Sequence, residues 1–256
     1  MAYGDSNSVR FKRLIRNPRR EAGRVFAFAK SRLAPTYRRL LESLGIYGRS
    51  KPFSGHDRFL PHVSTKKGFF VQCGGMDGYG NDPTYYLEKA LGWSGIIAEP
   101  LSAYESCKKN RRGSTVYNVA VGSFDNRGKT VSFVDVFGMS FVKGSRSDEN
   151  QWISVGETTQ GITARTIEVP MMPVQDLIDD YFSKNGKRKI DLFVADVEGY
   201  ELETLKGLDF KKNSPAQILL ESSSDRIGAL TVFLKEKKYV LADSFDNDYL
   251  FKLQTV

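Results

Sequence analysis

The sequence predicts an α/β fold with a mostly parallel sheet, covered by helices on both faces and closed by an antiparallel hairpin. From about residue 68 onward, short apolar runs alternate with segments of helical periodicity, which is the pattern of βαβ units. The last two apolar runs, 239–242 and 249–253, are separated only by a short polar loop. A connection this short favours antiparallel pairing. The hydrophobic content of 40% excludes a wholly disordered chain.

Start and stop signals delimit the first helices. Asp82 can cap a helix whose first turn admits Pro83, and Gly92 stands where a C-terminal glycine belongs. Ser102 and Glu105 form an S-x-x-E capping box for the next helix. Strands are expected at 68–73, 94–99, 115–121, 190–196 and 218–221, with further helices at 174–182, before Gly207, and at 227–234.

Residues 123–170 interrupt this alternation. The segment has a turn signal at 125–128, a short alternating run at 131–134, and then a polar stretch up to Ile162. A loop-rich insertion inside a compact domain is usually a lid or a binding surface. We therefore expect this insertion to select the substrate.

The basic charge is concentrated at the N-terminus. Residues 1–50 contain 12 Lys and Arg against 3 Asp and Glu, whereas the rest of the chain is nearly neutral. We predict a partly helical extension over 1–52 and a folded domain over 53–256. The extension could bind an anionic membrane surface or an acidic partner, or it could simply be solvated. With no run near 18 apolar residues and no secretory signal, the expected location is cytoplasmic, although Arg-rich organelle targeting is an alternative.

Acidic residues follow several predicted strands at their carboxyl ends, where open α/β sheets bind ligands. They are Asp77, Glu99, Asp196, Glu198 and Glu221. A glycine-rich turn after the first strand lets a ligand approach backbone amides, and Glu99 is placed to accept both hydroxyls of a ribose. Neither a G-x-G-x-x-G fingerprint nor a phosphate loop is present. The pattern favours an adenosyl cofactor.

Several segments, in order along the chain, resemble FkbM-type methyltransferases. They are residues 68–78 (GFFVQCGGMDG), 84–89 (TYYLEK), 92–100 (GWSGIIAEP), 190–201 (IDLFVADVEGYE) and 205–207 (LKG), preceded by an entry motif at Ser54 and Asp57. The resemblance implies a Rossmann-like class I methyltransferase fold with seven strands. It further implies S-adenosyl-L-methionine (SAM) as cofactor and methyl transfer to a hydroxyl of a sugar, glycan or small metabolite.

The predicted cofactor-binding residues include one departure from the family's residues, and a second departure lies in the same loop. They are Gln72, Gly74, Asp77, Gly78, Glu99, Pro100 and Ala120. Gln72 replaces the family's aspartate, and Met76 replaces an asparagine in the same loop. Losing the charge-assisted hydrogen bond predicts SAM binding weaker by roughly ten- to thirtyfold. The two departures also motivate an alternative, a non-catalytic member of the fold that binds a partner or membrane through its basic N-terminus.

The predicted catalytic residues are the carboxylates of the D-x-E-G motif. Methyl transfer to an unactivated hydroxyl requires removal of its proton, so we assign Glu198 as the base and Asp196 as the orienting group. The competing interpretation is structural: Asp196 caps the next helix and Glu198 pairs with a Lys or Arg. A divalent ion shared with Glu221 is conceivable, but three carboxylates alone are a weak signal, and no metal is predicted.

Other residues receive smaller roles. Trp152 is the candidate for stacking on a planar or sugar acceptor, and His56 could approach the acceptor. Cys73 and Cys107 are expected to be buried and unreactive. A nucleic-acid substrate is unlikely because no N/D-P-P-Y motif or Pro-Cys follows the fourth strand.

Overall fold

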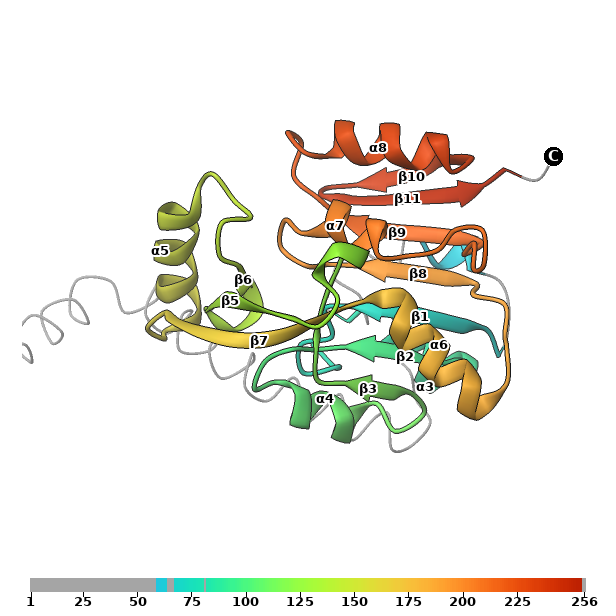
Figure 1. Ribbon diagram of the computed structural model, residues 1–256, viewed down its shortest axis with the longest axis horizontal. Coiled ribbons are helices and arrows are strands. Elements are labelled where there is room, and N and C mark those ends of the chain that lie inside the picture. The colour runs from blue at the N-terminus through green and yellow to red at the C-terminus, as the bar shows by residue number, and fades with distance from the viewer. Residues whose placement is uncertain (1–58, 64–66, 81, 255–256) are drawn as a thin grey trace, which may run out of the picture. The chain divides into compact units, whose positions relative to one another are not determined.

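The computed structural model describes residues 59–63, 67–80 and 82–254 (Figure 1). All of them belong to one unit of the chain, residues 51–256. The partly helical extension predicted over 1–52, the entry motif and His56 lie outside these described residues. Within the described ranges, no helix has the length and apolar character needed to cross a membrane.

The main sheet has seven strands in the order β10-β11-β9-β8-β1-β2-β3. Neighbouring strands from β9 to β3 are parallel, and β11 runs antiparallel to both β9 and β10. The strands are β1 (Phe69–Cys73), β2 (Ser94–Ala98), β3 (Thr115–Tyr117), β8 (Leu192–Ala195), β9 (Gln217–Glu221), β10 (Tyr239–Phe245) and β11 (Asp248–Leu253). The predicted fold class and the terminal hairpin are therefore confirmed.

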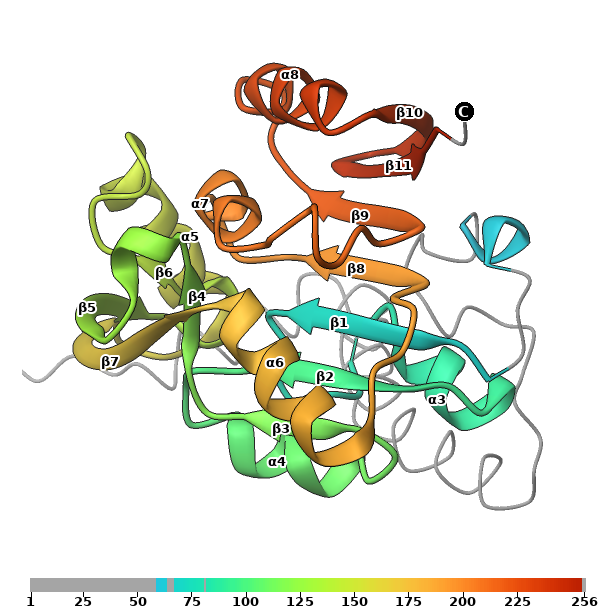
Figure 2. The same cartoon turned by 45° about the vertical axis from the view of Figure 1, so that its right-hand side comes forward.

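Helices cover both faces of this sheet. The helices are α3 (Tyr85–Leu91), α4 (Tyr104–Asn110), α6 (Val174–Asn185), α7 (Glu201–Lys206) and α8 (Ile227–Glu236), with a short 3-10 turn, η2 (Leu60–His62), before β1. In β1, Phe69 and Val71 pack toward α6 and α8, whereas Phe70 packs toward α3 and α4. Figure 2 shows α6 lying across β1 and β2. Because both faces are buried, the parallel strands read as unbroken apolar runs.

Two of the predicted helix boundaries differ in outcome. Gly92 ends α3 with φ of 68°, the left-handed conformation expected of a C-terminal glycine. The capping box predicted at the start of α4 is wrong: Ala103 is the capping residue and no side chain caps the helix. Ser102 instead lines a cavity.

The prediction of a loop-rich insertion is wrong. The expected strand at 115–121 divides into β3 and β4 (Ala120–Gly122), and β4 begins a second sheet of order β4-β7-β5-β6. Its other strands are β5 (Lys129–Asp135), β6 (Phe141–Val142) and β7 (Arg165–Pro173); 3-10 turns η3 (Phe124–Asn126) and η4 (Phe137–Met139) and helix α5 (Glu149–Gln160) complete the insertion. The β5–β7 pair joins residues about 30–40 positions apart, a contact that local sequence cannot reveal.

The second sheet stands where the parallel strands end. In Figure 1, the arrowheads of β1, β2 and β8 point toward the insertion. β4 continues from β3 and pairs with β7, which leads directly into α6. The insertion is thus anchored at both of its ends to the main fold, and it forms a wall beyond the carboxyl edge of the main sheet.

Candidate active site

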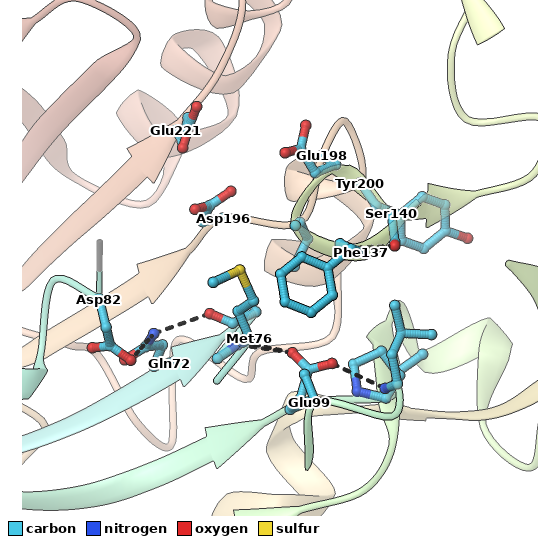
Figure 3. A pocket seen from close by; sticks show the side chains of 18 of the residues that line it. Gln72, Met76, Asp82, Glu99, Phe137, Ser140, Asp196, Glu198, Tyr200 and Glu221 are labelled. Carbon is cyan, nitrogen blue, oxygen red and sulfur yellow. Dashed lines mark hydrogen bonds between the residues drawn. The ribbon is translucent and has the colours of Figure 1, made fainter. Parts of the chain in front are cut away.

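A cavity of about 670 Å³ opens at the carboxyl ends of β1, β2, β8 and β9. The insertion and the turn of the terminal hairpin complete its walls. Seven of the predicted site residues line it: Gln72, Gly74, Glu99, Pro100, Ala120, Asp196 and Glu198. Figure 3 shows Asp196, Glu198 and Glu221 at one side and Glu99, Gln72 and Asp82 at the other, with Met76 and Phe137 between them.

Asp77 and Gly78 lie outside the lining and shape the loop after β1. The Asp77 carboxylate accepts hydrogen bonds of 2.9 Å from the backbone amides of Tyr79 and Gly80. Gly78 has φ of 68°, and a Cβ there would stand 2.6 Å from Cγ of Arg111. Both residues therefore hold the turn against α4, and their structural contacts account for their identity.

Gly74 allows the loop after β1 to approach the D-x-E-G loop after β8. Its φ is 85°, and a Cβ at this position would overlap the carbonyl oxygen of Asp196. The backbone of the loop after β1 consequently approaches the D-x-E-G loop as closely as only glycine permits. The space that glycine creates here is filled by the protein's own backbone.

Glu99 is a buried carboxylate held by backbone amides. Oε2 accepts hydrogen bonds from the amides of Gly75 at 3.2 Å and Met76 at 2.7 Å, and Oε1 accepts one from Leu101 at 2.9 Å. Burial raises the pKa of Glu99, and the three amides oppose that rise. A carboxylate offers about four acceptor sites, so one site on Oε1 remains. Glu99 can accept one ribose hydroxyl, rather than the two expected from the sequence.

Gln72 is tied into a buried network. Its Nε2 donates to the carbonyl of Gly74 at 3.0 Å and to Oδ2 of Asp82 at 3.3 Å, and its Oε1 accepts from the Thr84 hydroxyl. These contacts use the polar atoms of the amide. An aspartate at position 72 would place a second carboxylate beside Asp82. The departure from the family residue is thus compensated locally, and Gln72 faces the cavity with little capacity left for a ligand.

Arg111 is the centre of this network, although no motif in the sequence predicted this role. Its guanidinium, fully buried, donates to Asp82 at 2.7 Å, to Glu88 at 3.0 Å and to the Thr84 hydroxyl at 2.7 Å. Burial opposes ionisation of Glu88, but Arg111 and neighbouring donors hold its pKa below the ordinary value. Asp82 also accepts from the amides of Thr84 and Tyr85, but Thr84 occupies the capping position of α3, so Asp82 holds the turn before the helix and is not its capping residue as predicted.

Met76 and Phe137 lie in the middle of the cavity and connect its two sides (Figure 3). Met76 extends from the loop after β1 toward the insertion, where a Cβ on Gly138 would lie 3.0 Å from its sulfur. Phe137 is 47% exposed, large for a phenyl ring. A tight turn presents it: Asp135 accepts from the Phe137 amide at 3.1 Å, and the Ser140 hydroxyl donates to the Phe137 carbonyl at 2.6 Å.

Three carboxyl groups crowd the opposite side of the cavity. Burial, followed by Glu221 and Glu198, raises the pKa of Asp196 well above its ordinary value, and Asp196 shares a hydrogen bond with Glu221. Burial and Glu221 likewise raise the pKa of Glu198 to about 8, against the opposing charge of Arg146. Glu198 pairs with Arg146 at 3.6 Å, as the structural interpretation of the motif expected. Asp196 does not cap α7, because that helix begins after Tyr200.

Backbone strain is concentrated around this cavity. Met76, Phe137 and Glu198 have φ of 42°, 60° and 53°, in the left-handed region that residues with side chains rarely adopt. Each such residue costs about 1–3 kcal/mol and persists only where the surrounding structure enforces it. Strain of this kind gathers at functional sites, and all three residues line this cavity.

The sequence missed several lining residues. Asp135, Phe137 and Ser140 belong to the insertion, Tyr200 is the capping residue of α7, and residues 246–248 lie at the hairpin turn and the start of β11. The one available signal was Asp135, an acidic residue at the end of the alternating run at 131–134. The remaining residues reach the cavity only through the pairing of the second sheet and of the hairpin.

Other predicted residues take up different positions. Trp152 lies outside the lining and stacks on the guanidinium of Arg146, whose Cζ is 3.9 Å from the ring centroid. Cys73 and Cys107 are buried, and burial raises the pKa of both thiols, as expected of unreactive cysteines. Within residues 59–63, 67–80 and 82–254, no group of three or more His, Cys, Asp or Glu side chains could hold a metal ion.

The description "Methyltransferase FkbM domain" belongs to the family model that matches residues 72–241, more than half of the chain. The protein belongs to the FkbM methyltransferase family. The order of the seven strands agrees with the Rossmann-like methyltransferase fold that the resemblance implied. The family is one of methyltransferases, and SAM is the methyl donor that it implies.

Solved structures similar to this FkbM domain are remote. A precorrin-6y C5,15-methyltransferase from Geobacter metallireducens shares 9% identity, with 79% of this chain and 89% of that chain covered and a TM-score of 0.40. A putative RNA methyltransferase from Pyrococcus horikoshii shares 8% identity, with coverage of 77% and 81% and a TM-score of 0.40. The N-terminal domain of human METTL16 in complex with SAH shares 12%, with coverage of 77% and 65% and a TM-score of 0.37. No curated protein sequence matches the chain.

The residues of the FkbM cavity fit SAM. Its volume of about 670 Å³ is within the range typical of ligand sites, about 300–1,000 Å³. Glu99 retains an acceptor site for a ribose hydroxyl. The lining also contains eight Asp and Glu residues and no Lys or Arg, and a positive sulfonium or amino group bound there would favour the ionised form of Asp196 and Glu198.

Proposed function

We propose that this protein transfers a methyl group from SAM to a hydroxyl of an uncharged sugar, glycan or small metabolite. The observation that carries the proposal is the placement of Glu198 in the cavity with a pKa near 8. A carboxylate with a raised pKa is a stronger base than an ordinary one, and general-base catalysis is most effective when the pKa lies near the working pH.

When bound, SAM supplies an electrophilic methyl group on a sulfonium centre. In that chemistry the C–S bond of the methyl group would break as a C–O bond to the acceptor forms, which would give a methyl ether and S-adenosylhomocysteine. Glu198 takes the hydroxyl proton, for which it must be ionised. A cation bound nearby lowers the pKa of a carboxylate, so binding of the donor favours the active form of the base. Asp196, hydrogen-bonded to Glu221, orients the acceptor.

The charge of the cavity supports an uncharged acceptor. Eight carboxyl-bearing residues and no Lys or Arg line the walls. An acceptor carrying phosphate would be repelled, and recognition of nucleic acid requires basic side chains at the phosphates. The exposed ring of Phe137 offers an apolar face of the kind on which a sugar ring can pack.

The proposal is tested by measuring SAM binding and methyl transfer separately. Calorimetry gives the dissociation constant for SAM, and radiolabelled SAM reports transfer to a panel of neutral sugars and their phosphorylated counterparts. We expect transfer to neutral acceptors by the wild type. We expect turnover about 10²–10⁴-fold lower in Glu198→Gln, with SAM affinity changed less than threefold. Equal losses of turnover and affinity in that variant would remove Glu198 from the role of base.

Absence of binding heat at millimolar SAM would favour the alternative, a non-catalytic member of the fold. The specific observations behind that alternative are the commitment of Gln72 to internal hydrogen bonds and the extension of Met76 toward the insertion. In that case the basic residues 1–50, outside the described part of the chain, would carry the function through an anionic surface. Salt-sensitive sedimentation with phosphatidylserine vesicles, lost on deletion of residues 1–50, tests it.

A further inference from the structure

We propose that Arg146, supplied by the insertion, is a positioning residue that holds Glu198 in its reactive geometry. Arg146 lies between β6 and α5, and Glu198 lies after β8 in the main fold. The inference rests on the proposed role of Glu198 as the base. It assigns the insertion a part in the chemistry, in addition to forming a wall of the cavity.

Arg146 contacts both the main chain and the side chain of Glu198. Its Nη1 donates to the Glu198 carbonyl at 3.3 Å and lies 3.6 Å from Oε2 of the carboxylate. The backbone contact supports a residue whose φ is 53°, a conformation that requires support from its surroundings. A planar guanidinium can serve both contacts at once, which an ammonium group cannot do with the same geometry.

The Arg146 side chain is itself held on three sides. Nε and Nη2 donate to the two carboxylate oxygens of Asp148 at 2.9 and 3.1 Å, and the side chain is only 6% exposed. The guanidinium also stacks 3.9 Å from the ring centroid of Trp152, whose Nε1 donates to the Met139 carbonyl at 3.1 Å. Trp152 and Asp148 thus fix Arg146, and Arg146 in turn fixes Glu198.

Four other charged groups also face Glu198, one from its own loop and three from other elements. They are Asp196 after β8, Glu221 at the end of β9, Glu201 at the start of α7 and Arg226 just before α8. Arg226 packs against Gly199, where a Cβ would overlap its Nη1, and donates to the Ser223 hydroxyl at 2.8 Å. All four groups belong to the main fold. Arg146 is therefore the cation through which the insertion acts on the base.

The experiment follows the ionisation of Glu198 directly, without an acceptor. The full chain is labelled with ¹³C at the glutamate side-chain carboxyls, and NMR records their titration between pH 5 and 10. Glu198 is assigned by the signal missing in Glu198→Gln. In Arg146→Met we expect the Glu198 midpoint to rise by about one pH unit, a tenfold gain in proton affinity, because the favourable positive charge is lost.

Two further variants separate charge, geometry and general structural effects. Arg146→Lys keeps the charge but loses the planar fork, so its midpoint should move by less than about half a unit. Arg127→Met is the matched control. Arg127 also binds an aspartate, Asp176, through two donors, and its Cζ lies 5.6 Å from an aromatic ring centroid. None of these contacts involves Glu198. The control variant should leave the Glu198 midpoint unchanged. An unchanged midpoint in Arg146→Met, or an equal shift in Arg127→Met, would overturn the inference.

Methyl transfer provides the second readout. We expect Arg146→Lys to lower kcat about tenfold without altering the SAM dissociation constant, and this variant carries the test if Arg146→Met fails to fold. Full kcat in Arg146→Lys would overturn the positioning role. If the titration shifts as expected but the wild type transfers no methyl group, the proposed function fails while the contact between Arg146 and Glu198 stands. If the wild type transfers a methyl group but the Glu198 titration does not shift in Arg146→Met, the proposed function stands and the positioning role of Arg146 fails.

Discussion

The carboxyl groups on the two sides of the cavity have opposite surroundings. On the side of β1 and β2, each buried carboxyl has donors: Glu99 has three amides, and Asp82 has Arg111 and two amides. On the side of β8 and β9, Asp196, Glu198 and Glu221 face one another, and burial, followed by their mutual repulsion, raises the pKa values of Asp196 and Glu198. The first side is satisfied by the protein itself. On the second side, the raised pKa values mean that the carboxylates bind a proton more tightly than ordinary ones, as a general base must.

This difference makes opposite predictions for substitution. Removing a charged group from the satisfied side should destabilise the fold, because its partners become buried and unpaired. Neutralising a carboxyl on the crowded side should stabilise the fold while removing activity, which is the trade-off expected of catalytic residues.

The largest expected effect is at Arg111. Arg111→Met leaves Asp82 and Glu88 without their buried partner, so the free energy of unfolding should fall by about 3–5 kcal/mol. Chemical denaturation measures it. Arg127→Met removes an exposed ion pair of similar form and should leave the free energy of unfolding close to that of the wild type. Equal costs in the two variants would contradict the account of the buried network.

The next effect concerns the departure at position 72. Gln72→Asp restores the family residue but places a carboxylate beside Asp82, so at pH 8 it should destabilise the fold by about 2–3 kcal/mol. The loss should shrink at pH 5, where the new carboxyl becomes protonated. We expect no gain in SAM affinity by calorimetry. A tenfold tighter complex would show instead that the missing acid limits cofactor binding.

On the crowded side, Glu198→Gln should increase stability at alkaline pH. The pKa of Glu198 in the fold, near 8, is above its ordinary value of 4.5, so the folded state binds the proton more tightly than the unfolded state. That contribution is complete at low pH and is lost as pH rises through 8. The variant should match the wild type near pH 4 and exceed it by on the order of 2 kcal/mol at pH 9. If the variant is less stable than the wild type at pH 9, burial and the neighbouring carboxyl groups do not destabilise the ionised form of Glu198.

The smallest effect is at Glu99. Glu99→Gln retains one acceptor oxygen but loses the charge-assisted hydrogen bond to a ribose hydroxyl, so the SAM dissociation constant should rise about tenfold. Glu105→Gln, an exposed residue on α4, is the matched control and should leave affinity unchanged. Calorimetry compares the two. Unaltered affinity in Glu99→Gln would mean that the ribose lies elsewhere.

The strands and helices of the main sheet and the acidic residues at its edge could be predicted because the signals are local. Buried parallel strands are short apolar runs, and Glu99, Asp196 and Glu198 directly follow such runs. The second sheet could not be predicted, because β5 and β7 become recognisable as strands only when they pair across the insertion. The contact of Arg146 with Glu198 spans 52 positions, and that of Arg111 with Asp82 spans 29.

By itself, the sequence determined the alternation of strands and helices, the antiparallel hairpin and the presence of carboxyl groups where the strands end. Hydrophobic periodicity and the residues that start or stop helices act over a few positions, so the sequence alone reveals them. The tertiary structure decided which of those carboxyl groups is neutralised and which is crowded, because the ionisation of a buried group depends on the charges and donors that distant segments bring within a few ångströms.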